Sequence, residues 1–233
     1  MVRALLLAAG LGRRLRPLTN AVPKCLVPIR GKPLLGYWLE LLLGGGIERV
    51  LVNTHHLPEP VRMFVATSPW CRRVELVHED VLLGTGGTLL ANHDFFGAHS
   101  FMVAHADNLT RFDVGAFIAR HEKRPPGVEI TMMTFETDKP QSCGIVELDD
   151  RGVVTALHEK VVNPPSSCAN AAVYILEPTV IDFLTSLGKR VIDLTTEVLP
   201  HFLGRIANFR NAGYHRDIGT LESLRLAEAE FDP

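Results

Sequence analysis

Strand-like and helix-like segments alternate along the first half of the chain, and this alternation restricts its fold more than any other feature. Short apolar runs that predict strands fall at residues 4–9, 50–53, 74–78 and 101–104. An amphipathic segment at 33–43 and weaker helical patterns around 61–66 and after Gly84 lie between them. Strands separated by helices are typical of βαβ units with a parallel sheet. The pattern predicts the α/β class: a Rossmann-like mixed, mostly parallel sheet with flanking helices.

The second half is richer in strands. A helix is predicted from Asp113, as its N-cap, to His121. Strand-like runs follow at 128–135, 144–148, 154–157, 171–176 and 205–209, with helical segments at 179–187, 194–202 and from Leu221. No linker rich in Gly, Ser or Pro divides the sequence. We expect one domain, 1–233, with two halves at about 1–110 and about 111–233, the second a smaller β-rich lobe.

Composition argues against several classes of protein. The 233 residues carry a formal net charge of −2 and no basic run, unlike proteins that bind nucleic acid or acidic membranes generally. No segment reaches the roughly 18 apolar residues of a membrane helix, and the N-terminus lacks the pattern of a signal peptide. The four cysteines, Cys25, Cys71, Cys143 and Cys168, form no CxxC pair, as expected of free thiols in a reducing compartment. We expect a cytoplasmic protein with no nucleic-acid or membrane partner.

The first predicted strand runs directly into a turn that carries glycines and arginines. Gly10 and Gly12 follow the strand, and Arg13, Arg14 and Arg16 come next. Open α/β sheets bind ligands at the carboxyl ends of their strands. Glycine lets backbone N–H groups approach a phosphate, and arginine offers a planar fork of donors. These residues favour a polyphosphate cradle, although the glycine spacing alone also fits an ordinary strand-to-helix turn.

A longer pattern continues from this turn. It reads GxGxRxRPLT followed by PKxLxPI and is carried by Gly10, Gly12, Arg14, Pro17, Leu18, Thr19, Pro23, Lys24, Leu26, Pro28 and Ile29. The pattern resembles the signature of the sugar-1-phosphate nucleotidyltransferases, including those similar to mannose-1-phosphate guanylyltransferase. The resemblance implies the nucleotide-diphospho-sugar transferase fold, with the nucleotide bound by the first half and the sugar by the second. It also implies an enzyme that joins a nucleoside triphosphate to a sugar 1-phosphate and releases pyrophosphate.

By this resemblance, the opening turn binds the nucleotide and supplies two catalytic cations. Arg14 grips the outgoing pyrophosphate, and Lys24 bridges the reacting phosphates. The other nucleotide contacts expected here are Leu7, Ala8, Ala9, Gly10, Gly12 and Arg13. Such chemistry depends mostly on positioning and on electrostatic stabilisation, so no protein nucleophile is needed.

Two aspartates are the candidate metal ligands. Asp107 follows the strand at 101–104, at the same sheet edge as the opening turn, and Asp217 lies near the C-terminus. Their segments, AHADN and YHRDIGT, resemble two family segments that each give one aspartate to a shared Mg²⁺, although Ala106 replaces the usual glycine and Leu221 the usual proline. Carboxylate oxygens suit this ion when substrate phosphates also bind it. Mg²⁺ is therefore the expected cofactor, and Asp107 is expected to be catalytic.

A second glycine-rich segment resembles the part of the family that faces the nucleobase and the sugar. It reads LGTGGT from Leu83, and we expect Gly84 and Thr85 to contact the nucleotide, because glycines without Cβ let main-chain amides face a ring or a hydroxyl. Glu79 is placed to accept hydrogen bonds from a base edge, and a carboxylate there would favour guanine, which offers adjacent ring and exocyclic donors. A solvated acid at a strand end is an equally good interpretation of Glu79.

The sugar end of the predicted site departs further from the family pattern. Glu159 and Lys160 resemble the motif EKP, and NAAVY from Asn170 resembles NAGxY. The resemblance assigns Gly144, Glu159, Lys160 and Asn170 to the sugar phosphate. Val161 stands where proline is common, and Ala172 stands where glycine is common.

The histidines do not predict a metal site. The chain contains ten of them, but no HxH or HExxH spacing occurs. His55 and His56 are adjacent, so on a strand they would point to opposite faces.

The substrate pair that we favour is GTP with mannose 1-phosphate or a related manno-configured sugar (heptose) 1-phosphate. UTP or dTTP with glucose 1-phosphate or an amino-sugar 1-phosphate is the alternative within the class. Two further classes stay open: a catalytically silent subunit that binds nucleotide-sugars, and an activating enzyme for a non-sugar phosphate such as phosphocholine. The expected partners are the nucleotide and the sugar phosphate, and a homodimer is left open.

Overall fold

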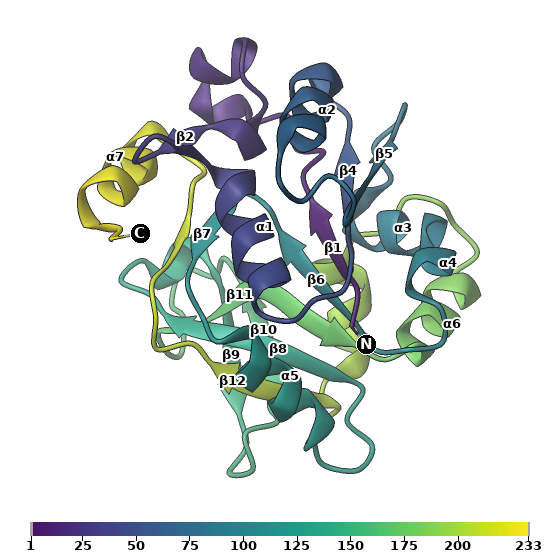
Figure 1. Cartoon of the computed structure of the whole chain (residues 1–233). Coiled ribbons are helices and arrows are strands. Elements are labelled where there is room, and N and C mark those ends of the chain that lie inside the picture. Colours follow the sequence, from purple (N-terminus) through teal and green to yellow (C-terminus); the bar gives the residue numbers. More distant parts are fainter. Residues whose placement is uncertain (1, 233) are drawn as a thin grey trace. The chain divides into compact units, whose positions relative to one another are not determined.

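The computed structural model, drawn in Figure 1, describes residues 2–232. The chain forms two compact units. The first unit contains the residues up to Leu82, Ala104–Val114, and the residues from Gly213 onward. The second unit contains Leu83–Val103 and Gly115–Ala212. One domain with halves at about 1–110 and about 111–233 stays a prediction.

Parallel strands form the centre of the first unit. The strands β1 (Ala4–Leu7), β4 (Val50–Thr54) and β5 (Val74–His78) pair in parallel, with β4 in the middle. Every residue of β4 is buried, which is typical of a central strand covered on both faces. The strand β6 (Phe101–His105) enters this unit at its carboxyl end, where the Ala106 N–H donates to the Leu7 carbonyl. The carboxyl ends of these strands meet at one edge.

Helices and short antiparallel pairs complete the first unit. The main elements are α1 (Leu34–Gly44), α2 (Pro58–Thr67), α7 (Leu221–Glu230), the pair β2 (Pro28–Ile29) with β3 (Lys32–Pro33), and the pair β7 (Asn108–Thr110) with β13 (His215–Asp217). Helix α1 buries Leu35, Trp38, Leu39 and Leu42 at helical spacing. Each fully buried leucine contributes about 2 kcal/mol. The indole N–H of Trp38 donates to the Asn108 carbonyl at 2.7 Å, which ties α1 to β7.

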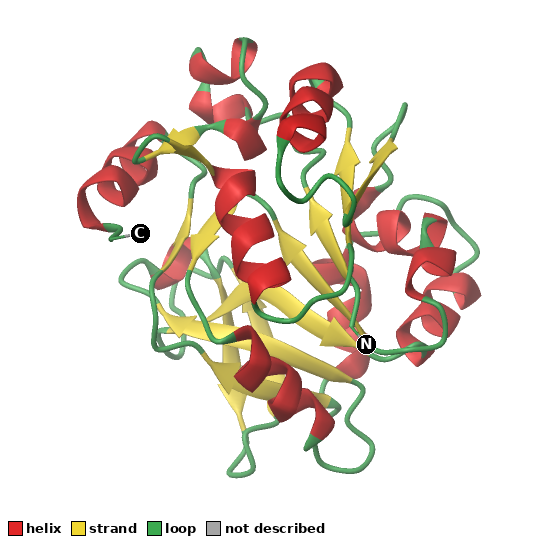
Figure 2. Cartoon of the chain, in the orientation of Figure 1, coloured by secondary structure: helices red, strands yellow, loops and turns green. Residues whose placement is uncertain are grey.

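Antiparallel pairing dominates the second unit. Its strands are β8 (Ile130–Glu136), β9 (Gly144–Leu148), β10 (Val154–Glu159), β11 (Cys168–Leu176) and β12 (Ile206–Arg210). Strand β11 pairs antiparallel with β8 and β9, and β9 pairs antiparallel with β10, whereas β12 pairs with β8 in parallel. Figure 2 shows helix α5 (Val114–Glu122) lying along these strands, and Arg120 of α5 donates to the Asn208 carbonyl of β12. The short helices α3 (Gly84–Ala91), α4 (His93–Phe96) and α6 (Thr179–Ser186) complete the unit.

The structure confirms the predicted α/β class, a mixed sheet with flanking helices, and corrects some elements. The segment predicted as helical at 194–202 is helical but is not one α-helix, because a π turn at Leu194–Val198 passes into a 3₁₀ turn at Leu199–Phe202. Pro200 explains the break, because proline removes an N–H and clashes with the preceding turn of an α-helix. The four free cysteines agree with the expected thiols. Between residues 2 and 232, every helix is too short or too polar to cross a membrane.

Candidate functional site

The turn after β1 is fixed by packing as well as by backbone conformation. Gly12 has a φ of +59°, in the left-handed region that favours glycine. Its carbonyl accepts the Thr19 hydroxyl at 2.8 Å, and a Cβ at Gly12 would lie 2.9 Å from the Thr19 methyl carbon. The glycine is therefore needed at this point, whereas a Cβ at Gly10 would meet open space.

Lys24 lies between two aspartates that are remote in sequence. It begins a 3₁₀ turn at Lys24–Leu26 and is only 8% exposed. Its Nζ lies 2.6 Å from Oδ2 of Asp107 and 3.5 Å from Oδ1 of Asp217. A buried lysine is costly unless it is paired, so the two carboxylates stabilise its charge.

The pairing of β7 with β13 brings the two aspartates together. Asp217 lies opposite Asn108 in the antiparallel register, and the Ile218 N–H donates to the Asp107 carbonyl at 3.0 Å. Asp107 itself follows β6, whose carboxyl end lies beside the end of β1. Sequence reasoning singled out both aspartates but not the short strands that join them.

Arg14 contacts the same carboxylate cluster from the opening turn. Its Nη2 lies 3.5 Å from Oδ2 of Asp217, and its side chain is 68% exposed. A Cβ at Gly219 would lie 2.6 Å from both the Arg14 Nη2 and the Asp217 Oδ2. Gly219 thus leaves room for this ion pair, a role that the motif YHRDIGT did not reveal. Arg13 and Arg16 are exposed.

The electrostatics of the cluster favour an ionised Asp107. Burial acts against its ionisation, but the Lys24 ammonium, His105 and the hydrogen bond from Lys24 together lower the pKa of Asp107 below its usual value. The neighbouring Cys25 behaves in the opposite way, since burial raises the pKa of its thiol to about 12. Asp107 is therefore charged at neutral pH, and Cys25 is an inert packing residue.

The two carboxylates fit a hard divalent cation that also binds substrate phosphates. Asp107 and Asp217 share one cationic partner, Lys24, so their side chains face a common point. Within residues 2–232, no group of three or more His, Cys, Asp or Glu side chains lies close enough together to hold a metal ion. A magnesium ion commonly takes only one or two carboxylates and completes its ligands with water and phosphate. The donor set suits such an ion and does not suit a structural zinc site.

Glu79 lies beside the opening turn but is buried. It is 5% exposed, and its Oε1 accepts a hydrogen bond from Nδ2 of Asn53 at 2.9 Å. The Asn53 Oδ1 in turn accepts the Ala8 N–H at 2.6 Å. The solvated strand-end acid considered for Glu79 is therefore wrong, and contact of Glu79 with a base edge stays a prediction.

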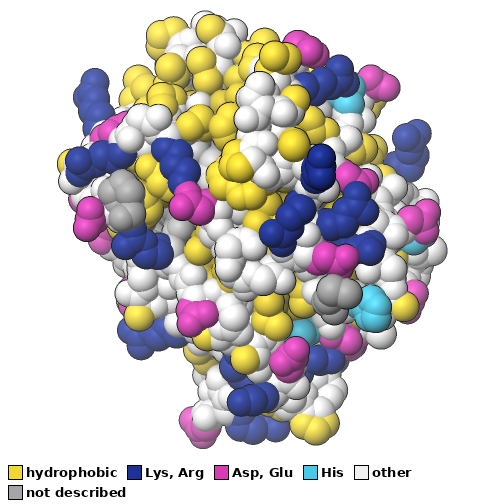
Figure 3. All heavy atoms as spheres, in the orientation of Figure 1, with side chains coloured by type: hydrophobic (Ala, Val, Ile, Leu, Met, Phe, Trp, Pro, Cys, Tyr) yellow, Lys and Arg dark blue, Asp and Glu magenta, His cyan; other side chains and the backbone are white. Residues whose placement is uncertain are grey.

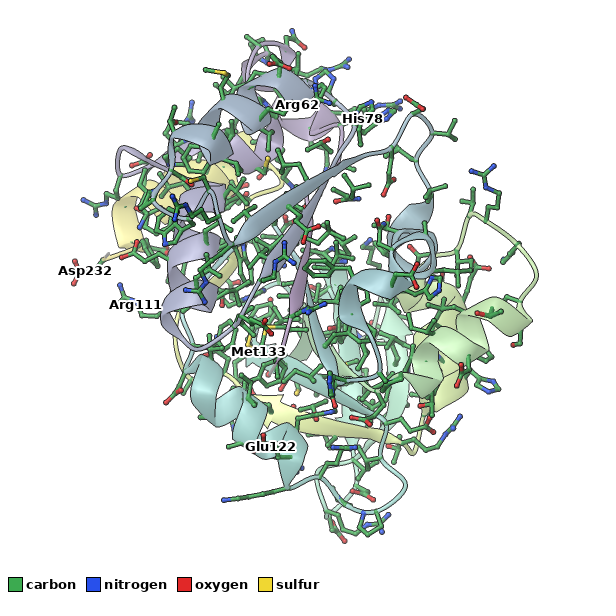
Figure 4. All side chains as sticks on the ribbon, turned by 45° about the vertical axis from the view of Figure 1, so that its right-hand side comes forward. Arg62, His78, Arg111, Glu122, Met133 and Asp232 are labelled. Atoms are coloured by element: carbon green, nitrogen blue, oxygen red, sulfur yellow. The ribbon has the colours of Figure 1, made fainter. Side chains whose placement is uncertain are left out.

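The histidines near this turn contact backbone carbonyls. His55 Nδ1 lies 2.7 Å from the Glu79 carbonyl, and His56 Nε2 lies 3.1 Å from the Thr19 carbonyl. Figure 4 labels His78, at the carboxyl end of β5, whose ring stacks near that of His55 with 6.4 Å between centroids.

In the second unit, the glycine-rich segment packs against its own chain. The amides of Gly86 and Gly87 both donate to the Ile192 carbonyl. A Cβ at Gly84 would lie 2.5 Å from that same oxygen. The expectation that these glycines turn their amides toward a ligand is therefore wrong for Gly86 and Gly87. The Thr85 hydroxyl accepts the Leu194 N–H at 2.7 Å, so its own proton remains available for donation.

The predicted sugar-phosphate residues also lie in the second unit, and three of them are neighbours. Gly144 pairs with Glu159 across β9 and β10, and a Cβ at Gly144 would lie 2.6 Å from the Glu159 Oε2. The Lys160 Nζ lies 3.1 Å from the Glu159 Oε1. Lys160 has a φ of +51°, which is strained for a residue with a Cβ and is typical of functional positions.

Asn170 is held by its own strand. Its Oδ1 accepts the Ala172 N–H at 2.9 Å, and its Nδ2 donates to the Tyr174 hydroxyl at 2.7 Å. Ala172 has a φ of +54°, and the register with β8 shifts between Asn170 and Tyr174. The bulge explains why glycine is common at this position in the family pattern.

On the face drawn in Figure 3, several Lys and Arg side chains gather right of the centre. There, Lys and Arg side chains are interspersed with Asp and Glu. The pattern agrees with the formal net charge of −2. An anionic ligand would thus depend on a local cluster such as that of Arg14 and Lys24.

Comparison with known proteins identifies the family of the chain. The family model described as nucleotidyl transferase matches residues 3–232. Mannose-1-phosphate guanylyltransferase of Mycobacterium tuberculosis is 31% identical over 235 residues, which cover 99% of this chain and 64% of the relative. UTP–glucose-1-phosphate uridylyltransferase of Synechocystis is 31% identical over 199 residues, covering 79% of this chain and 51% of the relative.

A solved structure agrees with these matches. HddC from Yersinia pseudotuberculosis, complexed with GMP-PN, has a TM-score of 0.83 and 26% identity over 100% of both chains. This chain spans less than two thirds of the length of the two curated relatives. The chain belongs to the nucleotidyl transferase family, as its resemblance to the sugar-1-phosphate nucleotidyltransferases predicted.

Proposed function

We propose that this chain transfers a nucleotidyl group from a nucleoside triphosphate to a sugar 1-phosphate. The observation that carries the proposal is the buried Lys24, which the carboxylates of Asp107 and Asp217 hold next to the opening turn. A binding module would have no need for a charged lysine between two aspartates. In the reaction, a phosphate oxygen of the sugar phosphate attacks the α-phosphorus of the nucleotide. The new P–O bond forms as the bond to the β-phosphate oxygen breaks, and pyrophosphate leaves.

The cationic side chains neutralise charge along this displacement. An ammonium has three N–H donors, and the two aspartates engage no more than two of those of Lys24, so at least one can face the α-phosphate. The exposed Arg14 guanidinium offers a planar fork for the pyrophosphate. Removal of one such charge-stabilising donor typically costs about 10²- to 10³-fold in rate.

The same aspartates are the proposed ligands of Mg²⁺. Asp107 and Asp217 would hold the ion, which when bound supplies positive charge to the substrate phosphates. The nucleotide contacts proposed in the opening turn are Leu7, Ala8, Ala9, Gly10, Gly12 and Arg13. Gly84, Thr85 and Glu79 are the further nucleotide-binding candidates.

The residues proposed for the sugar phosphate lie in the second unit. Gly144, Glu159 and Lys160 are neighbours there, and Asn170 lies in the bulge of β11. Glu159 offers acceptors for sugar hydroxyls, and Lys160 offers donors to the phosphate.

For the substrates, we propose GTP with mannose 1-phosphate or a related manno-configured sugar 1-phosphate. The name of the mycobacterial relative and the GMP-PN bound by the Yersinia structure support guanine, and the first names mannose. The uridylyltransferase of Synechocystis keeps UTP with glucose 1-phosphate as the alternative.

The test is pyrophosphate release from GTP, UTP, dTTP and CTP, each with mannose, heptose, glucose and N-acetylglucosamine 1-phosphates and with phosphocholine. GTP with mannose or heptose 1-phosphate should give the highest kcat/KM. Turnover only with phosphocholine would indicate a different class of enzyme. No turnover with any pair, together with tight binding of a nucleotide-sugar, would indicate a silent binding subunit.

A further inference from the structure

A buried amide connects three strand ends beside the nucleotide turn. Asn53 on β4 is 2% exposed, and it lies between Glu79, which follows β5, and Ala8, which follows β1. The register of the strands brings Asn53 close to both Ala8 and Glu79. Asn53 pairs with Leu7 on one side and with Val77 on the other, so its side chain lies at the edge where all three strands end.

The two hydrogen bonds fix which way the Asn53 amide points. The Ala8 N–H can only donate, so it requires the amide oxygen of Asn53 at 2.6 Å. The Glu79 Oε1 accepts, so it requires the amide nitrogen at 2.9 Å. A flipped amide would place donor against donor and acceptor against acceptor.

The Ala8 N–H is the first backbone donor after β1, where the chain leaves the sheet. A buried N–H without an acceptor costs about 1 to 3 kcal/mol. Asn53 satisfies this donor with a side chain, which lets the backbone turn away from β4 toward Gly10 and Gly12. The conformation of the turn thus depends on a side chain from the neighbouring strand.

We propose that Asn53, oriented by Glu79, is a positioning residue that holds the opening turn in its nucleotide-binding conformation. This inference rests on the proposed function, because it assumes that the turn binds a nucleotide. Asn53 acts through the main chain at Ala8. In this role the Glu79 carboxylate orients the Asn53 amide, which is separate from any contact of Glu79 with a base.

Two variants and a matched control test the positioning role. Asn53→Ala removes both hydrogen bonds, and Asn53→Asp keeps the shape and the acceptor for Ala8. Thr54→Val is the control: it removes a buried hydroxyl that donates to the Val77 carbonyl at 3.1 Å, on the same strand but away from the turn. The dissociation constant of GTP should rise at least tenfold in Asn53→Ala and change less than twofold in Thr54→Val.

The Asn53→Asp variant should bind GTP with a stronger pH dependence than the wild type. Its carboxylate would face that of Glu79 across the 2.9 Å contact, and two such groups share one proton more readily than they both ionise. The shared proton restores the bond at about pH 5, and its loss by about pH 8 sets like charges against each other, so GTP affinity should fall as pH rises. His55, His78 and Asp80 also lie near Glu79 and its strand end, but they are common to wild type and variant. Adding Glu79→Gln to Asn53→Asp should return the pH dependence of GTP binding to that of the wild type.

Hydrogen exchange of the Ala8 amide separates this inference from the proposed function. In the ligand-free protein, exchange at Ala8 should be at least tenfold faster in Asn53→Ala than in the wild type or Thr54→Val. If the wild type binds none of GTP, UTP and dTTP, the proposed function and the positioning role both fail, whatever the exchange rate. If it binds GTP but folded Asn53→Ala binds equally well, or Asn53→Asp shows no added pH dependence, the positioning role alone is overturned.

Discussion

The ammonium of Lys24 lies 2.6 Å from a carboxylate oxygen of Asp107, although 83 residues separate the two in sequence. One residue comes from the loop after β1 and the other from the end of β6, so the contact depends on the whole first unit being folded. Lys24 is buried, whereas Arg14 is mostly exposed. In the proposed reaction, the two cations are therefore suited to different parts of a polyphosphate, one buried and one exposed.

Replacement of Lys24 by methionine should reduce turnover with little change in length or shape. We expect kcat to fall about 10²- to 10³-fold, because a positive charge next to the reacting phosphate is lost. The midpoint of thermal unfolding should also fall, since two carboxylates would lose their shared partner.

The control for this prediction is Lys32→Met in the same unit, where Lys32 pairs with Glu40 on the surface. Its kcat should stay within twofold of the wild type. A Lys24→Met variant with normal kcat would remove Lys24 from the reaction.

Gly219→Ala should disturb Arg14 more than the fold. The added Cβ would lie 2.6 Å from the Arg14 Nη2, the far end of a flexible side chain, and 2.6 Å from the Asp217 Oδ2, so both partners of this ion pair must shift. We expect KM for the nucleotide to rise several-fold while the unfolding midpoint stays nearly constant. The control is alanine at Gly44, the last residue of α1, where a Cβ would meet open space outside the proposed site, and it should leave KM unchanged. An unchanged KM in Gly219→Ala would show that Arg14 does not depend on this glycine.

Ala172→Gly should stabilise the second unit. Ala172 has a φ of +54°, a conformation that costs a residue with a Cβ about 1 to 2 kcal/mol. Glycine avoids this strain but loses more entropy on folding, so the net gain is about 1 kcal/mol or less. The thermal midpoint should rise by up to about 4 °C. Ala169→Gly on the same strand, a buried position without positive φ, should lower the midpoint instead. A lower midpoint in both variants would contradict the strain argument.

Stability should fall as pH drops below about 6.5, in part because of His121. Burial lowers the pKa of His121, whose ring lies 2.8 Å from both Glu177 and Thr131. The folded protein therefore holds this ring neutral at pH values where the unfolded chain binds a proton, and proton binding favours the unfolded state. Burial also lowers the pKa of His215, to about 3, which acts in the same direction.

Urea unfolding at several pH values between 5 and 8 measures this effect. His121→Gln should reduce the slope of the unfolding free energy against pH by up to about 1.4 kcal/mol per pH unit, the limit for one proton. His93→Gln, at a side chain that is 55% exposed, is the comparison variant. An unchanged slope in His121→Gln would show that His121 has the same pKa in the folded and the unfolded protein, which would contradict the prediction.

Most of the fold could be predicted because most of its helices and strands have four or more residues, enough for a periodic apolar pattern to show. The predicted strand 74–78 and the predicted strand 144–148 coincide with β5 and β9. The segment 194–202 was predicted as helical, but its apolar spacing does not show that it divides into a π turn and a 3₁₀ turn near Pro200. The pairs β2 with β3 and β7 with β13 contain two or three residues per strand, too few for any periodicity to show.

The candidate site was less predictable, because it depends on contacts between remote residues. The sequence motifs identified Lys24, Asp107 and Asp217, but no local pattern shows that the lysine lies between the aspartates. The glycines from Gly84 onward illustrate the opposite case. Their absent side chains indicated a close approach correctly, but the approaching groups are Ile192 and the Arg190 carbonyl of the same chain.

The most direct test of the account is the rate of pyrophosphate release from GTP and mannose 1-phosphate with Mg²⁺ by the wild type, Asp107→Asn and Asp94→Asn. Asp94 is the matched control, since its side chain is 97% exposed and lies in the second unit. We predict turnover by the wild type and Asp94→Asn, and a loss of at least about 10²-fold in a folded Asp107→Asn. Full activity in Asp107→Asn, or no turnover by the wild type with any nucleotide and sugar phosphate, would contradict the account.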